Sequence, residues 1–208
     1  MRLTLISDTH GQHREVRLEP TDLLIHAGDV SARGGLDEVL NFLEWYALQE
    51  SKYKVFIAGN HDFFFEKASV AEVQAIIPHN IIYLNDSGIE IEGINIWGSP
   101  IQPWFYDWAF NRQRGTEIDK HWQLIPDNTD ILITHGPPYD RLDTVHDGQL
   151  VGCKDLLRKV QAIQPRLHVF GHIHEASGIQ QVDGTTFVNA SVLDVKYRLV
   201  NRPIVFEW

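Results

Sequence analysis

The chain contains five short apolar runs, and each of them ends in a cluster of polar residues and glycine. Aliphatic and aromatic runs bounded in this way predict buried β-strands. Between the runs, apolar side chains recur with the period of an α-helix. Strands that alternate with helices are typical of βαβ units around a parallel sheet. The predicted strands are 3–6, 22–27, 53–58, 131–134 and 167–170, and the predicted helices are 36–48, 69–77 and 151–163.

The other apolar segments alternate between apolar and polar side chains. The stretch 89–97 contains two such segments on either side of Gly93, which predicts a hairpin,. Two mixed sheets packed face to face, with helices outside, would bury this many strands. We therefore predict an α/β fold, a four-layer α-β-β-α sandwich of two mixed β-sheets flanked by helices. The additional strands are expected at 179–182, 185–189, 195–199 and 204–207.

The polar clusters that follow the first five strands supply the candidates for chemistry. In open α/β sheets, ligands bind beyond the carboxyl ends of the strands, so clusters far apart in the sequence are expected to meet. Oxygen and nitrogen side chains without sulfur favour Mn, Fe, Co, Zn or Ni over copper(I). Eight groups are too many for one tetrahedral ion and suit two ions that share a carboxylate. The eight are Asp8, His10, Asp29, Asn60, His61, His135, His172 and His174.

Composition narrows the choice of partner and compartment. The 208 residues carry 18 basic and 28 acidic side chains, a net charge of −10, which disfavours a long nucleic acid,. The single cysteine, Cys153, excludes an internal disulfide and a cysteine-based zinc cluster,. No apolar run approaches the roughly 20 residues of a membrane span, and no signal peptide is recognisable, so we expect a cytoplasmic protein. Without a repeat or a linker, residues 1–208 are expected to form a single domain,.

The polar clusters also form an ordered set of motifs. They are Asp-x-His at 8–10, Gly-Asp at 28–29, Gly-Asn-His at 59–61, Thr-His-Gly at 134–136 and Gly-His-x-His at 171–174. The set resembles the calcineurin-like metallophosphoesterase superfamily. Gly-Ser-Pro at 98–100 and Asn-Ala-Ser at 189–191 are similar to a narrower group, the metallophosphoesterase-domain-containing proteins known from animal brain and their microbial relatives.

This resemblance implies a role for each position. His61 would not ligate a metal, but would contact the phosphoryl group or protonate the leaving oxygen. A hydroxide that bridges the two ions would attack phosphorus in line, with manganese as the first metal expected. One ion would be held by Asp8, His10 and His174, the other by Asn60, His135 and His172, and Asp29 would bridge them.

The aromatic segment 104–110 has two interpretations. It is either a hydrophobic cluster under a long loop or a platform on which a nucleobase stacks. In the second interpretation, Trp104, Asn111 and Arg114 are the candidate substrate-binding residues, because the two polar side chains follow the aromatic ones closely enough to hold a phosphate or ribose.

The expected function is that of a dinuclear-metal-dependent phosphodiesterase on small phosphodiesters, cyclic nucleotides among them. The preference for diesters comes from the resemblance alone. One alternative is a phosphomonoesterase, including a protein phosphatase, and another is a metal-binding scaffold protein with weak activity. The expected partner is a small phosphoester, with no long nucleic acid and no membrane, and the sequence permits an oligomer without demanding one.

Overall fold

The computed structural model describes residues 1–208 and contains two large β-sheets that pack face to face. The first sheet has the strand order β13-β1-β2-β3-β4. Its strands are parallel except β13, which pairs antiparallel with β1. The bounds are β1 (Arg2–Ile6), β2 (Thr21–Ala27), β3 (Ser51–Ile57), β4 (Ile82–Tyr83) and β13 (Ile204–Glu207).

The second sheet has the order β11-β12-β10-β9-β6-β5. Its four central strands are parallel, and each edge strand pairs antiparallel with its neighbour. The bounds are β5 (Ser87–Ile91), β6 (Ile94–Ser99), β9 (Ile131–Thr134), β10 (Leu167–Phe170), β11 (Gly178–Val182) and β12 (Thr185–Asn189). A separate pair of two-residue strands, β7 (Gln102–Pro103) and β8 (Asn111–Arg112), brackets the aromatic segment.

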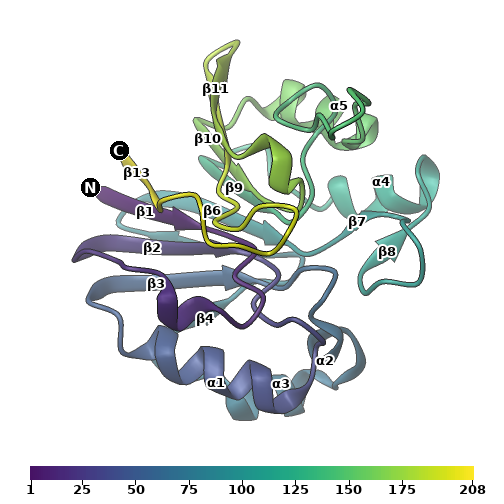
Figure 1. The fold of residues 1–208 in the computed structure, drawn as a ribbon. Coiled ribbons are helices and arrows are strands. Elements are labelled where there is room, and N and C mark those ends of the chain that lie inside the picture. Colours follow the sequence, from purple (N-terminus) through teal and green to yellow (C-terminus); the bar gives the residue numbers. More distant parts are fainter.

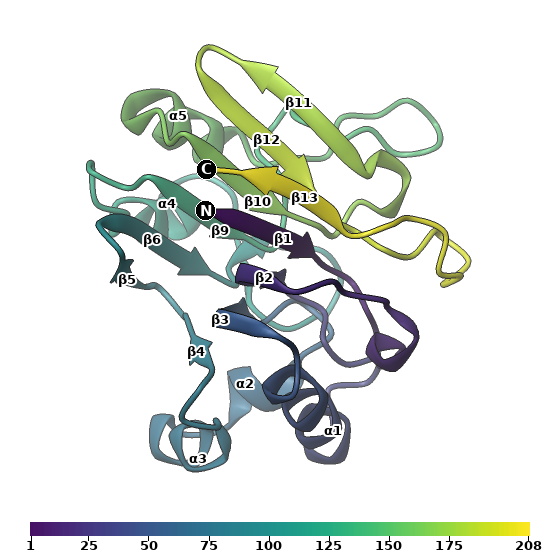
Figure 2. The same ribbon diagram turned by 90° about the vertical axis from the view of Figure 1, so that its left-hand side faces the viewer.

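Helices cover the outer face of each sheet, which confirms the predicted four-layer sandwich. Figures 1 and 2 show α1, α2 and α3 beside the first sheet and α4 and α5 beside the second. None of the helices is both long enough and apolar enough to cross a membrane. The bounds are α1 (Leu36–Ala47), α2 (Phe63–Lys67), α3 (Val70–Ile76), α4 (Thr116–Trp122) and α5 (Lys154–Ile163), with 3-10 turns at His13–Glu15 and His174–Ala176.

Alternation along the strands divides the core into an inner layer between the sheets and outer layers under the helices. Ile25 on β2 and Val169 on β10 are fully buried in the inner layer. Leu24, the neighbour of Ile25, belongs to the outer layer, where the Tyr46 hydroxyl of α1 donates to its carbonyl over 3.0 Å. Because successive side chains of a strand point to opposite faces, both faces of each central strand are apolar.

Local hydrogen bonds set where the predicted helices begin. In α3, the Ser69 hydroxyl accepts from the backbone N–H of Glu72, whose carboxylate accepts from Ser69 N–H over 2.8 Å. This is the capping box that the sequence predicted. The predicted helix 151–163 begins three residues later, at Lys154, because Cys153 is its N-cap and its Sγ accepts from Leu156 N–H.

The prediction of a strand at 195–199 is wrong. These residues form a tight loop, in which the Asp194 carboxylate accepts from the backbone N–H groups of Lys196 and Arg198 over 2.8 and 3.0 Å. Side-chain capture of backbone donors competes with strand pairing. Tyr197 consequently adopts a left-handed conformation, with φ of 56°. The other expected strands and the hairpin at 89–97 are present.

Candidate metal centre

The strands bring the polar clusters together at their carboxyl ends. Clusters after β1, β2 and β3 come from the first sheet, and those after β9 and β10 come from the second. The predicted metal ligands therefore meet at the edge where the two sheets adjoin. We call them the floor: Asp8, His10, Asp29, Asn60, His135, His172 and His174.

Asp8, His10 and His174 form the first group of the floor. One ligand atom of each lies within 4.8 Å of the others. His10 Nε2 is 3.4 Å from His174 Nε2, and His174 Nε2 is 3.6 Å from Asp8 Oδ1. Two imidazole nitrogens at this distance need a proton or a cation between them, because their lone pairs repel. The donor set fits a first-row metal ion.

Asp29 lies between this group and the next. Its Oδ2 is 3.5 Å from His10 Nε2 and 3.4 Å from His135 Nε2. Its Oδ1 accepts from the backbone N–H of His61 over 2.8 Å, which fixes the orientation of the carboxylate. A carboxylate placed between two groups of nitrogen ligands fits the position of a shared ligand.

Asn60, His135 and His172 form the other side of the floor. His135 Nε2 is 2.8 Å from Asn60 Oδ1, and the His135 and His172 ring centroids are 5.1 Å apart. Asn60 and His135 are buried, while His172 is partly exposed to the hollow above the floor. The three residues that were expected to hold a second ion thus lie together.

Backbone carbonyls orient three imidazoles around the floor. His61, His135 and His174 each donate Nδ1–H to a carbonyl, at 2.8, 3.0 and 3.0 Å. Since Nδ1 is committed in this way, Nε2 is the nitrogen available to a metal or a substrate. The accepting carbonyls belong to Ala32, Ala27 and Asp194, respectively.

In the buried floor, the pKa of a carboxylate is lowered and the pKa values of two imidazoles are raised, because the opposite charges stabilise each other. Burial lowers the pKa of His135, but Asp29, Asp8 and the Ala27 carbonyl together raise it by more, to about 9. Burial likewise lowers the pKa of His174, and Asp8, the Asp194 carbonyl and Asp29 together reverse the effect, so that this pKa also reaches about 9. Burial raises the pKa of Asp29, but His135 and His10 hold it well below its ordinary value. The floor therefore contains two ionised carboxylates whose negative charge keeps protons on His135 and His174 and would attract a cation in their place.

His10 and His172 show the opposite behaviour. Burial lowers their pKa values to about 4 and about 3, so both imidazoles are neutral at pH 7. Neutral imidazole is the form that ligates a metal. His10 Nδ1 is buried without a hydrogen-bond partner, in keeping with a ring that is positioned by packing rather than by a carbonyl.

The backbone of the floor is strained where it carries ligands. Asp8, His10, Asp29 and His172 have positive φ values of 55°, 42°, 57° and 67°. Non-glycine residues rarely adopt this conformation, and such strain concentrates at functional sites. Gly171 shows how closely the chain is packed, since a Cβ there would lie 2.1 Å from Asp8 Oδ2.

Asp62 ties two ligand loops together beneath the floor. Its carboxylate accepts from the backbone N–H groups of Val30, Ser31 and Gly59 at 3.1, 2.9 and 2.8 Å. These bonds hold the segment after β2 against the segment after β3. Burial, together with the nearby Asp29, raises the pKa of Asp62 to about 6.

A hollow of about 240 Å³ lies above the floor, and His61 is one of its walls. The His61 ring stacks on Trp108 with centroids 4.1 Å apart, and a His61 ring nitrogen lies within 4.8 Å of ligand atoms of His10 and Asp29. The lining contains neither lysine nor arginine. It consists of Asp29, Asn60, His61, Phe105, Trp108, His172, His174, Glu175, Val195 and Tyr197.

The three predicted substrate-binding residues do not line this hollow. Both terminal nitrogens of Arg114 donate to backbone carbonyls, those of Gly152 and Val151, over 2.8 and 2.7 Å. The Asn111 amide donates to the carbonyls of Phe105 and Tyr106 and accepts from Phe105 N–H. Trp104 is exposed. Their role in binding substrate stays a prediction.

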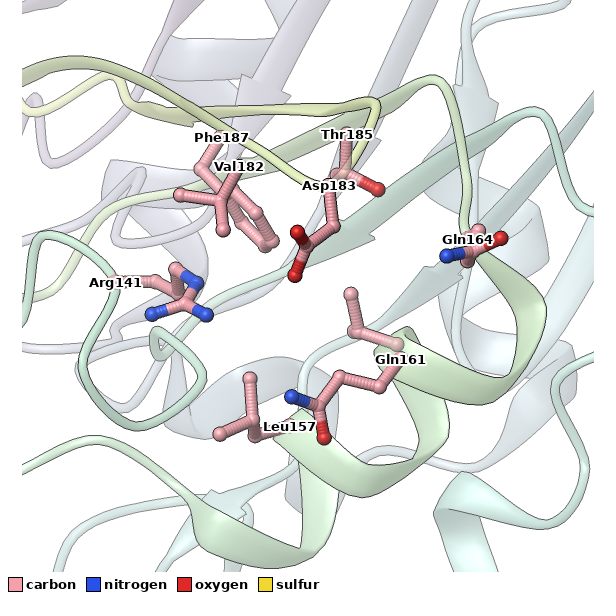
Figure 3. Close-up of a pocket in the computed structure, with 9 residues that line it drawn as sticks. Arg141, Leu157, Gln161, Gln164, Val182, Asp183, Thr185 and Phe187 are labelled. Carbon is pink, nitrogen blue, oxygen red and sulfur yellow. The ribbon is translucent and has the colours of Figure 1, made fainter.

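The sequence reasoning did not single out three aromatic residues that do line the hollow. Phe105 and Trp108 belong to the aromatic segment, in which the sequence carries no sign of which rings face inward. Tyr197 lies in the stretch that was expected to be a strand. A second hollow, of about 180 Å³, lies between α5 and the β11–β12 hairpin beside Arg141 and contains no residue of the floor (Figure 3).

Comparisons with known proteins agree with this geometry. The family model described as calcineurin-like phosphoesterase matches residues 1–176. Metallophosphoesterase domain-containing protein 1 from human is 44% identical over 99% of this chain and 70% of its own length, and the mouse protein matches equally well. A Caenorhabditis elegans protein is 37% identical over 99% of this chain and 74% of its own.

A solved structure supports the fold alone. The crystal structure of a phosphopantetheinyl hydrolase from Mycobacterium tuberculosis superposes with a TM-score of 0.62 at 14% identity. The match covers 97% of this chain and 95% of the other.

Proposed function

The chain belongs to the calcineurin-like phosphoesterase family, and from this premise we propose that it is a phosphodiesterase that acts on small phosphodiesters. Hydrolysis of phosphoric esters with the help of bound metal is the activity of the family. For this chain we propose in addition that two ions bind to the floor residues, that His61 donates the proton, and that diesters are preferred. One observation carries it: Asp29 Oδ2 lies 3.5 Å from His10 Nε2 and 3.4 Å from His135 Nε2.

The floor would hold two divalent ions, with manganese the first to test. Asp8, His10 and His174 would bind one, Asn60, His135 and His172 the other, and Asp29 both. Bound there, two ions would lower the pKa of water and stabilise the charge on the attacking and leaving oxygens. Because Nδ1 of His135 and of His174 donates to a carbonyl, Nε2 is the nitrogen with which each would bind an ion.

His61 is the proposed proton donor to the departing ester oxygen. Its Nδ1–H is committed to the Ala32 carbonyl, so the proton that it can transfer is the one on Nε2 of the imidazolium. Stacking against Trp108 holds the ring plane in the wall of the hollow. A positioned acid of this kind contributes typically 10²–10⁴-fold to the rate.

The charge of the hollow favours a diester over a monoester. A phosphomonoester carries close to two negative charges at pH 7, whereas a diester carries one. Asp29 and Glu175 are the carboxylates in the lining, and no lysine or arginine is present to balance the extra charge of a monoester. With a net charge of −10, the chain also repels polyanions such as long nucleic acids,.

Chromogenic esters separate the diesterase from its alternatives. We expect bis(p-nitrophenyl) phosphate to be hydrolysed faster than p-nitrophenyl phosphate by the manganese-loaded chain, with chelator abolishing the activity and Mn²⁺ restoring it. A faster reaction with the monoester would favour a phosphomonoesterase. Turnover of neither ester with any of Mn²⁺, Fe²⁺, Co²⁺, Zn²⁺ or Ni²⁺ would favour a metal-binding scaffold.

A further inference from the structure

Three aromatic rings surround the floor, and each packs against a different part of it. The Trp108 ring stacks on His61, and the Phe105 ring meets His172 edge-on with centroids 6.4 Å apart. Tyr197 packs against both His10 and His174, at 4.9 and 5.6 Å. We call Phe105, Trp108 and Tyr197 the aromatic rim. It places an apolar wall beside the ligands of each proposed ion and beside the proposed acid.

Phe105 is available to a ligand although its backbone is fixed. Half of its surface is exposed (50%), and its backbone N–H and C=O are both hydrogen-bonded to the Asn111 amide. The segment is also tied to the floor, because Ala109 N–H donates to the Asn60 carbonyl over 3.0 Å. A ring on a fixed backbone loses little conformational entropy when a flat group packs against it.

The backbone of Tyr197, in the loop 194–198, is also fixed by hydrogen bonds. Within this loop the Asp194 carboxylate accepts from Arg198 Nε. Gln12 Nε2 donates to the Tyr197 carbonyl over 3.0 Å. The ring is about half exposed (48%), and its hydroxyl makes no hydrogen bond within the protein. The Asp194 carbonyl also accepts from His174 Nδ1–H, so this loop positions Tyr197 and a floor residue together.

We propose that Phe105 and Tyr197 are specificity-determining residues that hold the ester group which remains on phosphorus, and that this group is aromatic. The assignment rests on the proposed function. His61 and Trp108 form the wall where the departing group leaves, so the other substituent of a diester is left to the walls formed by Phe105 and Tyr197. Both walls are uncharged, and aromatic rings pack favourably with flat π-systems.

Two diesters with the same leaving group test the proposal. Phenyl p-nitrophenyl phosphate and methyl p-nitrophenyl phosphate both release nitrophenol, and they differ only in the group that remains. We expect the manganese-loaded chain to favour the phenyl compound in kcat/KM by about tenfold. In the double variant Phe105→Ala, Tyr197→Ala, this ratio should approach that of the two esters in uncatalysed hydrolysis, with metal content unchanged.

Val200→Ala is the control, since Val200 is an exposed apolar side chain next to the loop of Tyr197 and lies outside the lining of the hollow. It should leave the ratio unchanged. A readout without turnover is the calorimetric affinity for phenylphosphonate against methylphosphonate, whose P–C bonds are not hydrolysed. The unsubstituted chain should bind the phenyl compound about tenfold tighter, and the double variant should lose this difference.

The two proposals fail in different ways. If the unsubstituted chain hydrolyses both diesters and the double variant keeps the same preference, the assignment of Phe105 and Tyr197 is overturned while the phosphodiesterase remains. If neither diester is hydrolysed, the proposed function is wrong, and the phosphonate affinities still decide whether the two rings hold an aromatic group. An equal affinity of the unsubstituted chain for both phosphonates overturns the assignment as well.

Discussion

The floor and the aromatic rim lie next to each other but are built in different ways. Floor residues follow buried strands, four of them have positive φ, and Gly28, Gly59 and Gly171 beside them leave no space for a Cβ. Phe105 and Tyr197 of the rim are half exposed and sit on loops that single polar side chains, Asn111 and Asp194, hold in place. Changes in the floor should therefore abolish function, whereas changes in the rim should alter which substrate is preferred.

The largest expected effect is that of Gly171→Ala in the floor. The new Cβ would lie 2.1 Å from both Asp8 Oδ2 and Ser7 Oγ, so the backbone or the carboxylate must move. Because a displacement of about 1 Å at a reactive site can cost 10²-fold, and a displaced ligand also weakens metal binding, we expect activity to fall to background. Metal content measured by mass spectrometry should fall with it.

Gly136→Ala is the control for this substitution, because Gly136 directly follows a floor residue. A Cβ there would meet nothing closer than the Gln102 Cβ, at 3.8 Å. Its metal content and kcat should match those of the unsubstituted chain. If Gly136→Ala were as damaging as Gly171→Ala, the crowding around Asp8 would not be the cause.

His61→Ala should separate turnover from metal binding. The side chain stacks on the rim while its backbone N–H bonds to Asp29, so it belongs to the boundary between the two regions. We expect kcat to fall about 10²–10⁴-fold. Metal content should be unchanged, since the proposed ligand sets do not include His61. Loss of one ion per chain in this variant would instead make His61 a ligand.

Metal affinity should depend on pH, whereas the preference for the phenyl diester over the methyl diester should not. His135 and His174 have pKa values near 9 in the metal-free protein, so each carries a proton that metal must displace. The dissociation constant for Mn²⁺ should therefore fall between pH 6 and 9, by up to about tenfold per unit for each proton displaced. Calorimetry of the metal-free chain measures this, and a flat profile would mean that the two histidines are not ligands.

The raised pKa values of His135 and His174 also determine how the stability of the metal-free fold changes with pH. Their folded-state pKa is raised above the ordinary 6.5, so their contribution to the metal-free fold is complete below pH 6.5 and is lost as pH rises through 9,. Metal should reverse this trend at high pH, because it replaces the protons that are lost.

The smallest expected effect is that of Arg198→Ala beside the rim. Arg198 is exposed and pairs with Asp194, which also accepts backbone N–H groups of the same loop. Because those backbone bonds remain, we expect the preference for the phenyl diester to fall only about twofold to threefold, with metal content unchanged. A complete loss of the preference would show that the ion pair, rather than the backbone, fixes Tyr197.

The position of the floor could be predicted from the sequence, because the ends of the buried strands can be recognised there. A run such as 131–134 followed by His135 places the histidine at the carboxyl end of a buried strand, and parallel strands bring such ends together,. The positive φ values of Asp8 and Asp29 could not be predicted in the same way, because they result from tertiary packing rather than from residue type,.

The rim was less predictable, and Tyr197 and Arg114 show why. The segment around Tyr197 alternates like a strand, and only the structure shows that Asp194 captures its backbone. Arg114 follows aromatic residues, the position expected of a phosphate-binding side chain, yet it donates to two carbonyls of the chain. Residue type identifies a hydrogen-bond donor but not its acceptor. The short α2 and α4 escaped prediction because one or two turns show no period,.

The inner layer of the core also has a consequence for chemistry, because the first sheet supplies Asp8, His10 and Asp29 and the second supplies His135, His172 and His174. Ile25 and Val169 fill the space between these two sheets. Each proposed ion would take ligands from both sheets, so the layer acts as a spacer that sets the distance between the two halves of each ligand set. A methyl group removed from Ile25 or Val169, neither of which is a ligand, would change that distance before it unfolded the protein,.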